Sequence, residues 1–362
     1  MLAVAGNASK YVRRMTNREQ RRDRASSIFR TMREDDPVNA LPGDDSPMND
    51  DKIDTKEHPV IALGPMTPPA VRVPEPALIN QLSSAAQELG AAHDLGRVPK
   101  QRLPLPRVLA IANQKGGVGK TTTAVNLGAS LAELGYRVLV IDLDPQGNAT
   151  TGLGVNARNL DSSVYDVILH DLPIEDCIEP TNLRNLFLVP ATIDLAGAEI
   201  ELVPVFSREL RLKRAIATVL DDFDFVLIDC PPSLGLLTVN ALAAAYEVAV
   251  PIQCEYYALE GLGQLLSNIE RVRANLNPDL SVTTIIMTMY DARTRLAEQV
   301  VEEVRRHFGE RVCRSVVPRT VRLSEAPSFG QPIIVFDPTS RGATAYRELA
   351  KEVSGGAPKR VR

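Results

Sequence analysis

From residue 107 onward, short apolar runs alternate with longer segments in which apolar residues recur every three or four positions. Short apolar runs are typical of buried strands, and the longer pattern is typical of amphipathic helices. Strands and helices in alternation predict an α/β fold built on a mostly parallel sheet. The predicted strands are Val108–Ala112, Val138–Asp142, Leu186–Pro190, Phe225–Asp229, Val248–Ile252, Thr283–Met289 and Ile333–Phe336.

The segments between these runs predict the helices. They are Lys120–Leu134 with Gly135 as its stop, Leu236–Ala245, Leu259–Leu276, Ala297–Phe308 and Ala343–Val353. We therefore expect one twisted sheet of about seven to eight strands with helices on both faces. The domain should span residues 107–353, followed by a basic flexible tail at residues 354–362.

Residues 1–106 have a different composition, Arg-rich at first and then acidic and Pro-rich. Such a segment buries too little apolar surface to offset the entropy lost on ordering, which predicts a largely disordered extension. Two helical patterns occur in it, Asn17–Met32 and Pro76–Leu89. They could dock on a partner such as a polar scaffold protein, or form only transiently in solvent. A true start at a later methionine is a further alternative.

Bulk composition narrows the function classes without choosing one. The formal net charge is −4, so any binding of nucleic acid must rely on a local basic patch. No run approaches the roughly 18 apolar residues of a membrane helix, and no apolar segment follows the basic N-terminus. The four cysteines are far apart, which favours buried thiols over a disulfide framework or a zinc site. These features predict a cytoplasmic protein.

The segment between the first predicted strand and the first predicted helix carries the clearest chemistry. It reads Lys115, Gly116, Gly117, Val118, Gly119, Lys120, Thr121, Thr122 and Thr123. Glycines let the backbone turn its N–H groups toward a phosphate, and the following helix adds its positive N-terminal end. In this motif the lysine at position 120 reaches the β- and γ-phosphates and the hydroxyl at position 121 ligates Mg²⁺. The segment predicts an ATP site.

Further motifs follow other predicted strands. They are Asp142-Leu143-Asp144-Pro145-Gln146-Gly147, Asp229-Cys230-Pro231-Pro232-Ser233, Thr288-Met289-Tyr290-Asp291-Ala292-Arg293-Thr294 and Ser324-Glu325-Ala326-Pro327-Ser328-Phe329-Gly330. With the extra lysine at the start of the glycine loop, the chain resembles the ParA/MinD group of deviant Walker A ATPases, and the ParA/Soj chromosome-partitioning proteins in particular. The resemblance covers about residues 107–353. The leader is similar to that of actinobacterial chromosomal versions.

The resemblance implies a role for each residue of the site. Lys115 would reach the phosphate bound by a second copy, so that ATP lies within a homodimer interface. Asp144 would position the attacking water, and Lys120 would act with them in hydrolysis. Thr121, Asp142 and Asp229 are the candidate Mg²⁺ ligands; for Asp142 in particular, an aspartate that only caps a strand end is the competing interpretation.

The resemblance also implies contacts outside the phosphate loop. Adenine would meet Pro318 and Arg319, and DNA would meet Arg293 and Arg322. Ordinary surface arginines are the alternative for the last two. Because each neutralised phosphate steepens the salt dependence of binding, pairing two copies would convert weak DNA binding into useful binding.

The expected function is therefore an ATPase that dimerises around ATP and binds double-stranded DNA without reading its sequence. It would be nucleoid-associated, hydrolyse ATP slowly, be stimulated by a ParB-type centromere-binding partner, and segregate a chromosome or plasmid. Two alternatives use the same loop. A MinD-like membrane ATPase would need an apolar C-terminal helix face, which residues 354–362 lack. A metabolic P-loop enzyme, such as a nitrogenase-reductase or ligase relative, would use the loop for other chemistry.

Overall fold

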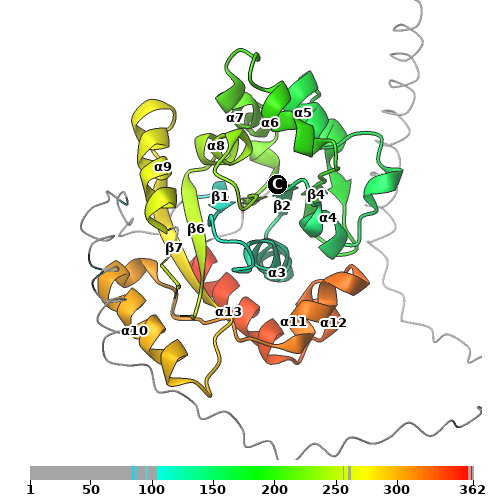
Figure 1. Cartoon of the computed structure of the whole chain (residues 1–362). Coiled ribbons are helices and arrows are strands. Elements are labelled where there is room, and N and C mark those ends of the chain that lie inside the picture. The colour runs from blue at the N-terminus through cyan, green and yellow to red at the C-terminus, as the bar shows by residue number, and fades with distance from the viewer. Residues whose placement is uncertain are drawn as a thin grey trace, which may run out of the picture. The chain divides into compact units, whose positions relative to one another are not determined.

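Figure 1 shows a computed structural model of the chain. It describes Ser84, Gln87, Leu95, residues 104–255, 257–259 and 262–357, and Arg360. The chain divides into two units, Met1–Arg72 and Val73–Arg362, and the first lies wholly outside the described residues together with the predicted helix Asn17–Met32. Of the predicted helix Pro76–Leu89, Ser84 and Gln87 are described, and both are helical and exposed. No helix in the described part of the chain is long and apolar enough for a membrane crossing.

A single sheet forms the centre of the second unit, with strand order β3-β4-β2-β5-β1-β6-β7. All neighbours are parallel except β3, which is antiparallel to β4. The strands are β1 (Arg107–Ile111), β2 (Val138–Asp142), β3 (Glu179–Pro180), β4 (Leu186–Val189), β5 (Phe225–Asp229), β6 (Glu247–Gln253) and β7 (Ser281–Thr288). Six of the seven predicted strands are therefore confirmed, and β3 was not predicted.

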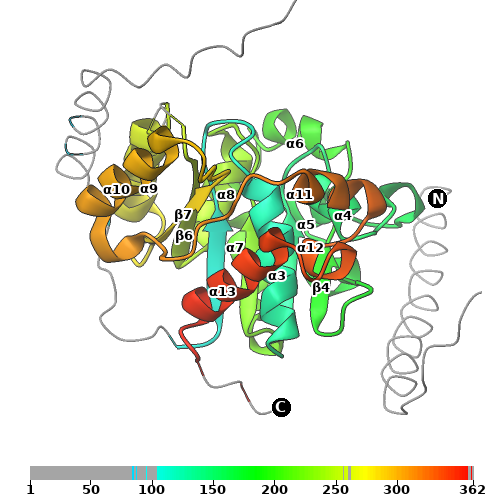
Figure 2. The same cartoon turned by 90° about the horizontal axis from the view of Figure 1, so that it is seen from below.

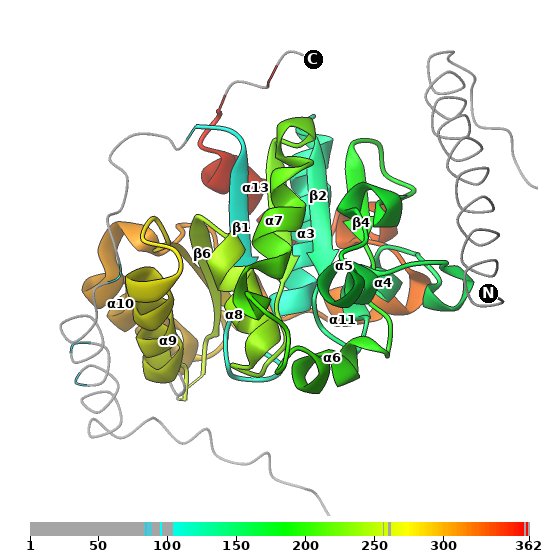
Figure 3. The ribbon, with the colours of Figure 1, turned by 90° about the horizontal axis from the view of Figure 1, so that it is seen from above.

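Helices cover both faces of this sheet, as Figures 2 and 3 show from below and from above. The α-helices are α3 (Lys120–Glu133), α4 (Asn148–Gly152), α5 (Val164–His170), α6 (Leu195–Glu201), α7 (Arg211–Ala217), α8 (Leu236–Ala244), α9 (Leu262–Asn275), α10 (Arg295–Phe308), α11 (Val321–Glu325), α12 (Ile333–Phe336) and α13 (Arg341–Ser354). Short 3-10 turns are η1 (Ala157–Asn159), η2 (Ile174–Cys177), η3 (Arg208–Leu210), η4 (Leu220–Asp222), η5 (Gly309–Arg311) and η6 (Ala326–Phe329).

The alternation of side chains along β1 explains why the run is continuously apolar. Val108 and Ala110 belong to one buried cluster with residues of α5 to α10, whereas Leu109 and Ile111 belong to another with residues of α3, α12 and α13. A parallel strand buried on both faces needs apolar residues at every position. The expected α/β fold with helices on both faces is thus confirmed.

The predicted strand Ile333–Phe336 is wrong, because these residues form the one-turn helix α12. Pro332 precedes it, and the N–H of Ile333 donates to Asn126 Oδ1 on α3 at 2.6 Å. Ile333 and Ile334 are buried against α3, while the Phe336 ring stacks on Phe329. A four-residue apolar run is compatible with either a strand or a helix turn, and here the hydrogen bond to α3 and this packing go with the helical turn.

The amino end of the sheet holds a buried ion pair. Arg107 Nε and Nη2 donate to the two carboxylate oxygens of Glu247 at 2.6 and 2.7 Å. Arg107 Nη1 also donates to the Val353 carbonyl of α13, and the Thr283 hydroxyl donates to Glu247 Oε2 at 2.7 Å. The pair joins β1, β6, β7 and α13, and each guanidinium nitrogen and each carboxylate oxygen has a hydrogen-bond partner.

Leu95 reaches the same end of the sheet from the leader. Its side chain is only 8% exposed and belongs to the buried cluster on the α5 to α10 face. Its carbonyl accepts a hydrogen bond from the N–H of Val282 on β7 at 3.0 Å. Because β7 lies at the edge of the sheet, this contact covers a backbone group that the edge would otherwise expose.

The C-terminal residues that follow α13 also contact the body of the domain. Ala357 is buried, and its carbonyl accepts a hydrogen bond from the Tyr136 hydroxyl at 2.6 Å. Arg360 pairs with Asp221 at 2.9 Å.

Candidate nucleotide site

The glycine loop joins the carboxyl end of β1 to the N-terminus of α3. Gly117 and Gly119 have φ angles of 73° and 90°, in the left-handed region that glycine adopts without strain. Gly119 is the N-cap of α3, and no side chain in the described part of the chain caps this end. The first N–H groups of α3 are therefore free to meet an anion, and they add the positive end of the helix dipole.

Two polar side chains hold the loop in place, and the sequence analysis assigned this role to neither. Asn113 accepts the N–H of Lys115 at 3.0 Å and donates to the Pro251 carbonyl on β6 at 2.8 Å. Thr288, the last residue of β7, donates to the Val118 carbonyl at 2.8 Å. Both follow or end apolar runs, and this position after a strand was the signal that could have found them.

The two lysines of the loop occupy different environments. Lys120 is buried, and its Nζ donates to the Lys115 carbonyl within the loop at 3.1 Å. Burial lowers the pKa of Lys120, an effect opposed by the nearby carboxylates of Asp229 and Asp144. Lys115 is half-buried, and its Nζ lies 3.4 Å from the Tyr257 carbonyl in an exposed contact. Lys120 thus lies within its own loop, and Lys115 has its charged end in solvent.

Three aspartates gather at the carboxyl ends of neighbouring strands. Asp142 and Asp229 are paired in register on β2 and β5, and Ile111 of β1 is in register with Asp229 on its other side. Asp144 follows two residues after Asp142, is almost fully buried, and accepts the N–H of Gln146 at 3.0 Å. The sheet therefore brings the predicted acidic residues together beside the glycine loop.

Asp142 and Asp229 differ in how they are hydrogen-bonded. Asp142 accepts the N–H and hydroxyl of Thr150 at 2.8 and 2.7 Å and the N–H of Asp144 at 3.2 Å. Both oxygens of Asp229 are fully buried and have no hydrogen-bond partner among the described residues. The Thr121 hydroxyl comes near enough to favour the charged form of Asp229 without the geometry of a hydrogen bond. Hydrogen bonds therefore hold the Asp142 carboxylate in place, whereas both oxygens of Asp229 can still accept hydrogen bonds or bind a cation.

The two paired carboxyls hold their protons more tightly than usual. Burial raises the pKa of Asp142 to about 6, and the hydrogen bonds from Thr150 limit the rise. Burial also raises the pKa of Asp229, and the neighbouring Asp142 carboxylate adds to the effect. Two carboxylates on adjacent strands cannot both ionise cheaply without a cation between or beside them.

These residues fit a magnesium ion shared with phosphate. An unpartnered buried carboxylate beside a threonine hydroxyl offers the hard oxygen ligands that Mg²⁺ prefers. No group of three or more His, Cys, Asp or Glu side chains in the described residues could hold a metal by itself. Since Mg²⁺ is usually held by one or two protein oxygens together with substrate phosphates and water, this sparse set of ligands is the expected one.

The segment predicted to meet adenine lies beyond the end of β7. Tyr290 and Pro318 form a parallel bridge, and the N–H of Arg319 donates to the Tyr290 carbonyl at 3.0 Å. Thr288, two residues before Tyr290, is the residue that holds the glycine loop. Pro318 and Arg319 are therefore placed on the loop side of the sheet, and their contact with adenine stays a prediction.

The two arginines predicted to meet DNA extend from the same region. Arg293 follows Tyr290 by three residues, and Arg322 lies on α11, four residues after Pro318. Each is paired with acids. Arg293 binds both oxygens of Asp291 at 2.9 and 2.7 Å, and Arg322 binds Asp337 at 2.9 Å and Glu325 at 3.0 Å. Their role on DNA stays a prediction.

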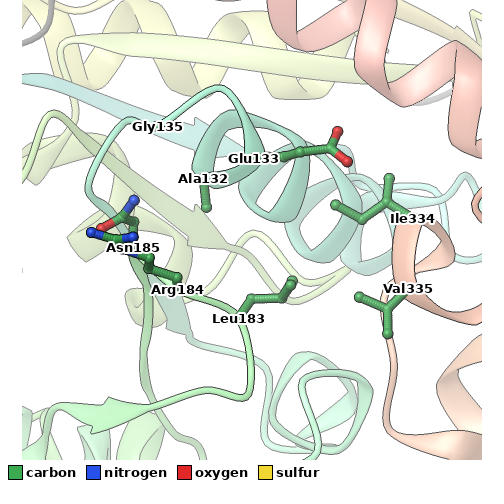
Figure 4. Close-up of a pocket in the computed structure, with 8 residues that line it drawn as sticks. All are labelled: Ala132, Glu133, Gly135, Leu183, Arg184, Asn185, Ile334 and Val335. Atoms are coloured by element: carbon green, nitrogen blue, oxygen red, sulfur yellow. The ribbon is translucent and has the colours of Figure 1, made fainter. Parts of the chain in front are cut away.

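A cavity of about 510 Å³ lies at the other end of α3, beside Gly135. Figure 4 shows its lining, in which Leu183 comes from the turn before β4 and Ile334 and Val335 come from α12. It is separated from the glycine loop by the length of α3, and it contains none of the predicted site residues. It is not the nucleotide site.

A left-handed glycine loop between a strand and a helix, with a buried lysine and aspartates on neighbouring strand ends, defines a P-loop nucleoside triphosphatase. Residues 106–282 match a family model described as an AAA domain. The chain is 58% identical over 248 residues to the sporulation initiation inhibitor protein Soj of Bacillus subtilis, covering 68% of this chain and 98% of Soj. It is 52% identical over 269 residues to the chromosome partitioning protein ParA of Myxococcus xanthus, covering 73% and 95%. The chain belongs to the ParA/Soj family of chromosome-partitioning ATPases, and it is an ATPase.

Solved structures support the same fold. A cobyrinic acid a,c-diamide synthase from Mycobacterium smegmatis, with bound ATP analogue and magnesium, has a TM-score of 0.60 and 45% identity over 68% of this chain and 93% of that chain. The septum site-determining protein MinD of Pyrococcus horikoshii, complexed with Mg-ADP, has a TM-score of 0.56 and 27% identity over 68% and 95%. Nucleotide and magnesium occur together in both relatives.

Proposed function

We propose that this ATPase binds Mg-ATP between two copies of the chain, binds DNA without sequence preference in that state, and segregates a chromosome or plasmid. The observation that carries the proposal is the buried charge at the carboxyl end of the sheet. Among the described residues, Lys120 bonds only to its own loop there, and the two buried oxygens of Asp229 have no partner. Such groups are costly to bury unless a ligand completes them.

The geometry supports a distinct role for each of these residues around the triphosphate. The N–H groups at the start of α3 would bind the phosphates, and Lys120 would exchange the Lys115 carbonyl for phosphate oxygens. Thr121 and Asp229 would hold Mg²⁺, which neutralises charge on the triphosphate when bound. Asp142, held by Thr150, would support this set from behind. Asp144, whose Oδ1 is fixed by the N–H of Gln146, would orient the attacking water.

Lys115 would complete the site of a second copy. Its backbone is fixed by Asn113, while its Nζ is exposed and makes one long contact with the Tyr257 carbonyl. A cation that is anchored at its base and free at its tip can reach a neighbour's polyphosphate, where a charge-assisted hydrogen bond gains most. ATP would thereby control whether two copies are joined.

DNA binding would follow from joining two copies. Arg293 and Arg322 supply two candidate phosphate contacts in each copy, so a dimer supplies about four, and affinity should fall steeply with salt. A partner of the ParB type, carrying a basic segment, would stimulate hydrolysis and release the DNA. Both steps are inferences from the family, and nucleoid association would be their consequence.

The experiment measures retention of random double-stranded DNA by Asp144→Ala and wild-type chain with ATP, ADP or no nucleotide. We expect Asp144→Ala to retain DNA with ATP only, while its turnover falls roughly 100-fold or more because the water is no longer oriented. Arg322→Gln should lose retention. Arg347→Gln, which changes an arginine on α13 that is paired with Glu133 of α3, should keep it. Retention that ignores nucleotide would refute the proposed switch.

The name of the M. smegmatis relative favours one second candidate, an ATP-dependent synthase. Its identity to this chain is 45%, against 52% and 58% for the relatives named for partitioning and sporulation control. The same experiment separates the two functions, because a synthase would show no ATP-dependent DNA retention. The MinD likeness of 27% identity carries the fold and no membrane role.

A further inference from the structure

Exposed apolar side chains concentrate around helix α6. Nine large apolar side chains are exposed in the described part of the chain, and four of them fall within residues 193–206. They are Ile193, Ile200, Val203 and Phe206, exposed by 76%, 78%, 57% and 91%. We call these four the apolar ridge. A cluster of this kind on a well-packed domain marks a protein contact more often than chance.

The ridge spans helix α6 and the turns on either side of it. Leu195, Ala198 and Leu202 point inward and are fully buried. Ile200 lies on the exposed side of α6, while Ile193 precedes the helix and Val203 follows it. Phe206 follows in the turn after the helix. Because large apolar side chains are exposed in the helix and in the turns on both sides of it, this segment is suited to contact a partner.

Contacts tie α6 to two of the acid-bearing strand ends. The segment before α6 begins at Ala191, whose N–H donates to the hydroxyl of Thr150, the residue that holds Asp142. On α6, Glu199 Oε1 lies 3.5 Å from the hydroxyl of Ser233, in the loop that follows Asp229. A Cβ at Gly235 would lie 1.9 Å from the Glu199 carboxylate, so that loop passes directly under α6.

The position of the apolar ridge and the charges beside it indicate which kind of partner binds there. In Figures 2 and 3, α6 and the loop between β1 and α3 lie at the same edge of the domain. A second copy that shares ATP through Lys115 must approach this edge. Asp194, Glu199 and Glu201 lie among the ridge residues. The nearby basic side chain of Arg208, which donates to the Val203 carbonyl, is paired with Glu209 at 3.0 Å. These charges disfavour DNA or an anionic lipid surface as the occupant.

We propose that the apolar ridge is the contact by which a second copy of this chain packs beside the shared nucleotide. The inference rests on the proposed ATP-dependent dimer and adds its apolar anchor. Because α6 contacts the loops after Asp142 and Asp229, a change in those loops on ATP binding moves the ridge. Nucleotide state therefore sets both the phosphate contact from Lys115 and the apolar contact from α6.

The test uses the full chain with Asp144→Ala, so that hydrolysis does not end the dimer. Ile200→Gln with Phe206→Gln is added, because both positions are highly exposed and tolerate polar residues. Val335→Gln, at an exposed apolar position beside the far end of α3, is the matched control. Dimerisation is measured by sedimentation equilibrium with Mg-ATP, and binding of a fluorescent ADP reports an intact site.

We expect the ridge variant to weaken dimerisation by about tenfold or more with ADP binding unchanged, and the control to dimerise normally. Unchanged dimerisation of the ridge variant, while the Asp144→Ala chain dimerises, would overturn the ridge and leave the proposed function standing. Normal dimerisation with loss of stimulation by a basic partner would assign the ridge to that partner and also overturn the inference. A chain that stays single with Mg-ATP would overturn the dimer itself.

Discussion

The two ends of the parallel sheet treat buried charge in opposite ways. At the amino end, Arg107 and Glu247 form a bidentate pair. Glu247 also accepts a hydrogen bond from the Thr283 hydroxyl, and Arg107 donates one to the Val353 carbonyl. At the carboxyl end, Lys120 bonds to a loop carbonyl, and both oxygens of Asp229 lack partners among the described residues.

This difference distinguishes charged groups that stabilise the folded chain from charged groups that a ligand would complete. A buried pair with all its hydrogen bonds made is stable in isolation, and its loss costs folding free energy. A buried carboxylate without partners lowers the stability of the free chain and is kept because something binds there. Completeness of hydrogen bonding, more than burial, therefore distinguishes the structural edge from the functional edge.

The largest expected effect is on stability, at the amino end. Glu247→Gln should lower the free energy of unfolding by about 3–5 kcal/mol, because it leaves Arg107 buried without a counter-charge. Urea unfolding measures this change. Glu133→Gln, which breaks an equally bidentate but exposed pair with Arg347, should cost less than about 1 kcal/mol. Equal losses in the two variants would remove the distinction drawn for Arg107.

Leu95 tests whether the leader belongs to the amino end. Leu95→Ala should lower the free energy of unfolding by about 2 kcal/mol, since it empties a site in the core beside β7. Hydrogen exchange at Val282 should rise in the same variant, because loss of the buried side chain loosens the segment whose backbone carbonyl accepts this N–H. A variant as stable as the wild-type chain, with Val282 still protected, would place Leu95 outside the core.

At the carboxyl end, Asp229→Asn should change stability in the other direction. The nucleotide-free variant should gain about 1 kcal/mol, because an unpartnered buried carboxylate is replaced by a neutral group. ATP hydrolysis should be lost at the same time. A destabilised variant that still hydrolyses ATP would show that Asp229 is a structural group like Glu247.

The pH dependence of stability provides a finer test of the same carboxyls. Their pKa values are raised in the folded chain, so as pH rises the unfolded chain loses these protons first. Their contribution to stability therefore falls from about pH 4 to about pH 6 and beyond. Subtracting the Asp229→Asn curve from the wild-type curve should leave a difference that declines over this range. A flat or rising difference would contradict the raised pKa values.

Much of this could be read from the sequence, because the strongest signals are local. A strand, a glycine loop and a helix N-terminus are neighbours in the chain, so their residues alone predicted the loop around Lys120. Continuous apolar runs predicted β1, β2 and β5, and an aspartate at the end of two of them predicted the acidic group. Contacts between residues far apart in the sequence could not be predicted in this way. Thr288 holds the loop from 170 residues away, and Asn126 binds the turn that became α12 instead of a strand.

Two further features, the hydrogen bonding of the paired aspartates and the exposure of the apolar ridge, could be learned only from the tertiary structure. Asp142 and Asp229 each end an apolar run, and the sequence does not show how either carboxylate is hydrogen-bonded. Only the fold shows that Thr150 binds one and that nothing described binds the other. The apolar ridge could not be predicted either, because an apolar residue in the sequence does not show whether the fold covers it.

If the unpartnered groups at the carboxyl end bind Mg-ATP, the nucleotide should stabilise the folded chain in a way that depends on Asp229. The free energy of unfolding is compared for the wild-type and Asp229→Asn chains, each with EDTA alone, ATP with EDTA, and Mg-ATP. We expect Mg-ATP to stabilise the wild-type chain by about 2.7 kcal/mol at 100 times its Kd, and the magnesium-dependent part to disappear in Asp229→Asn. Equal stabilisation of both chains by Mg-ATP would contradict this expectation.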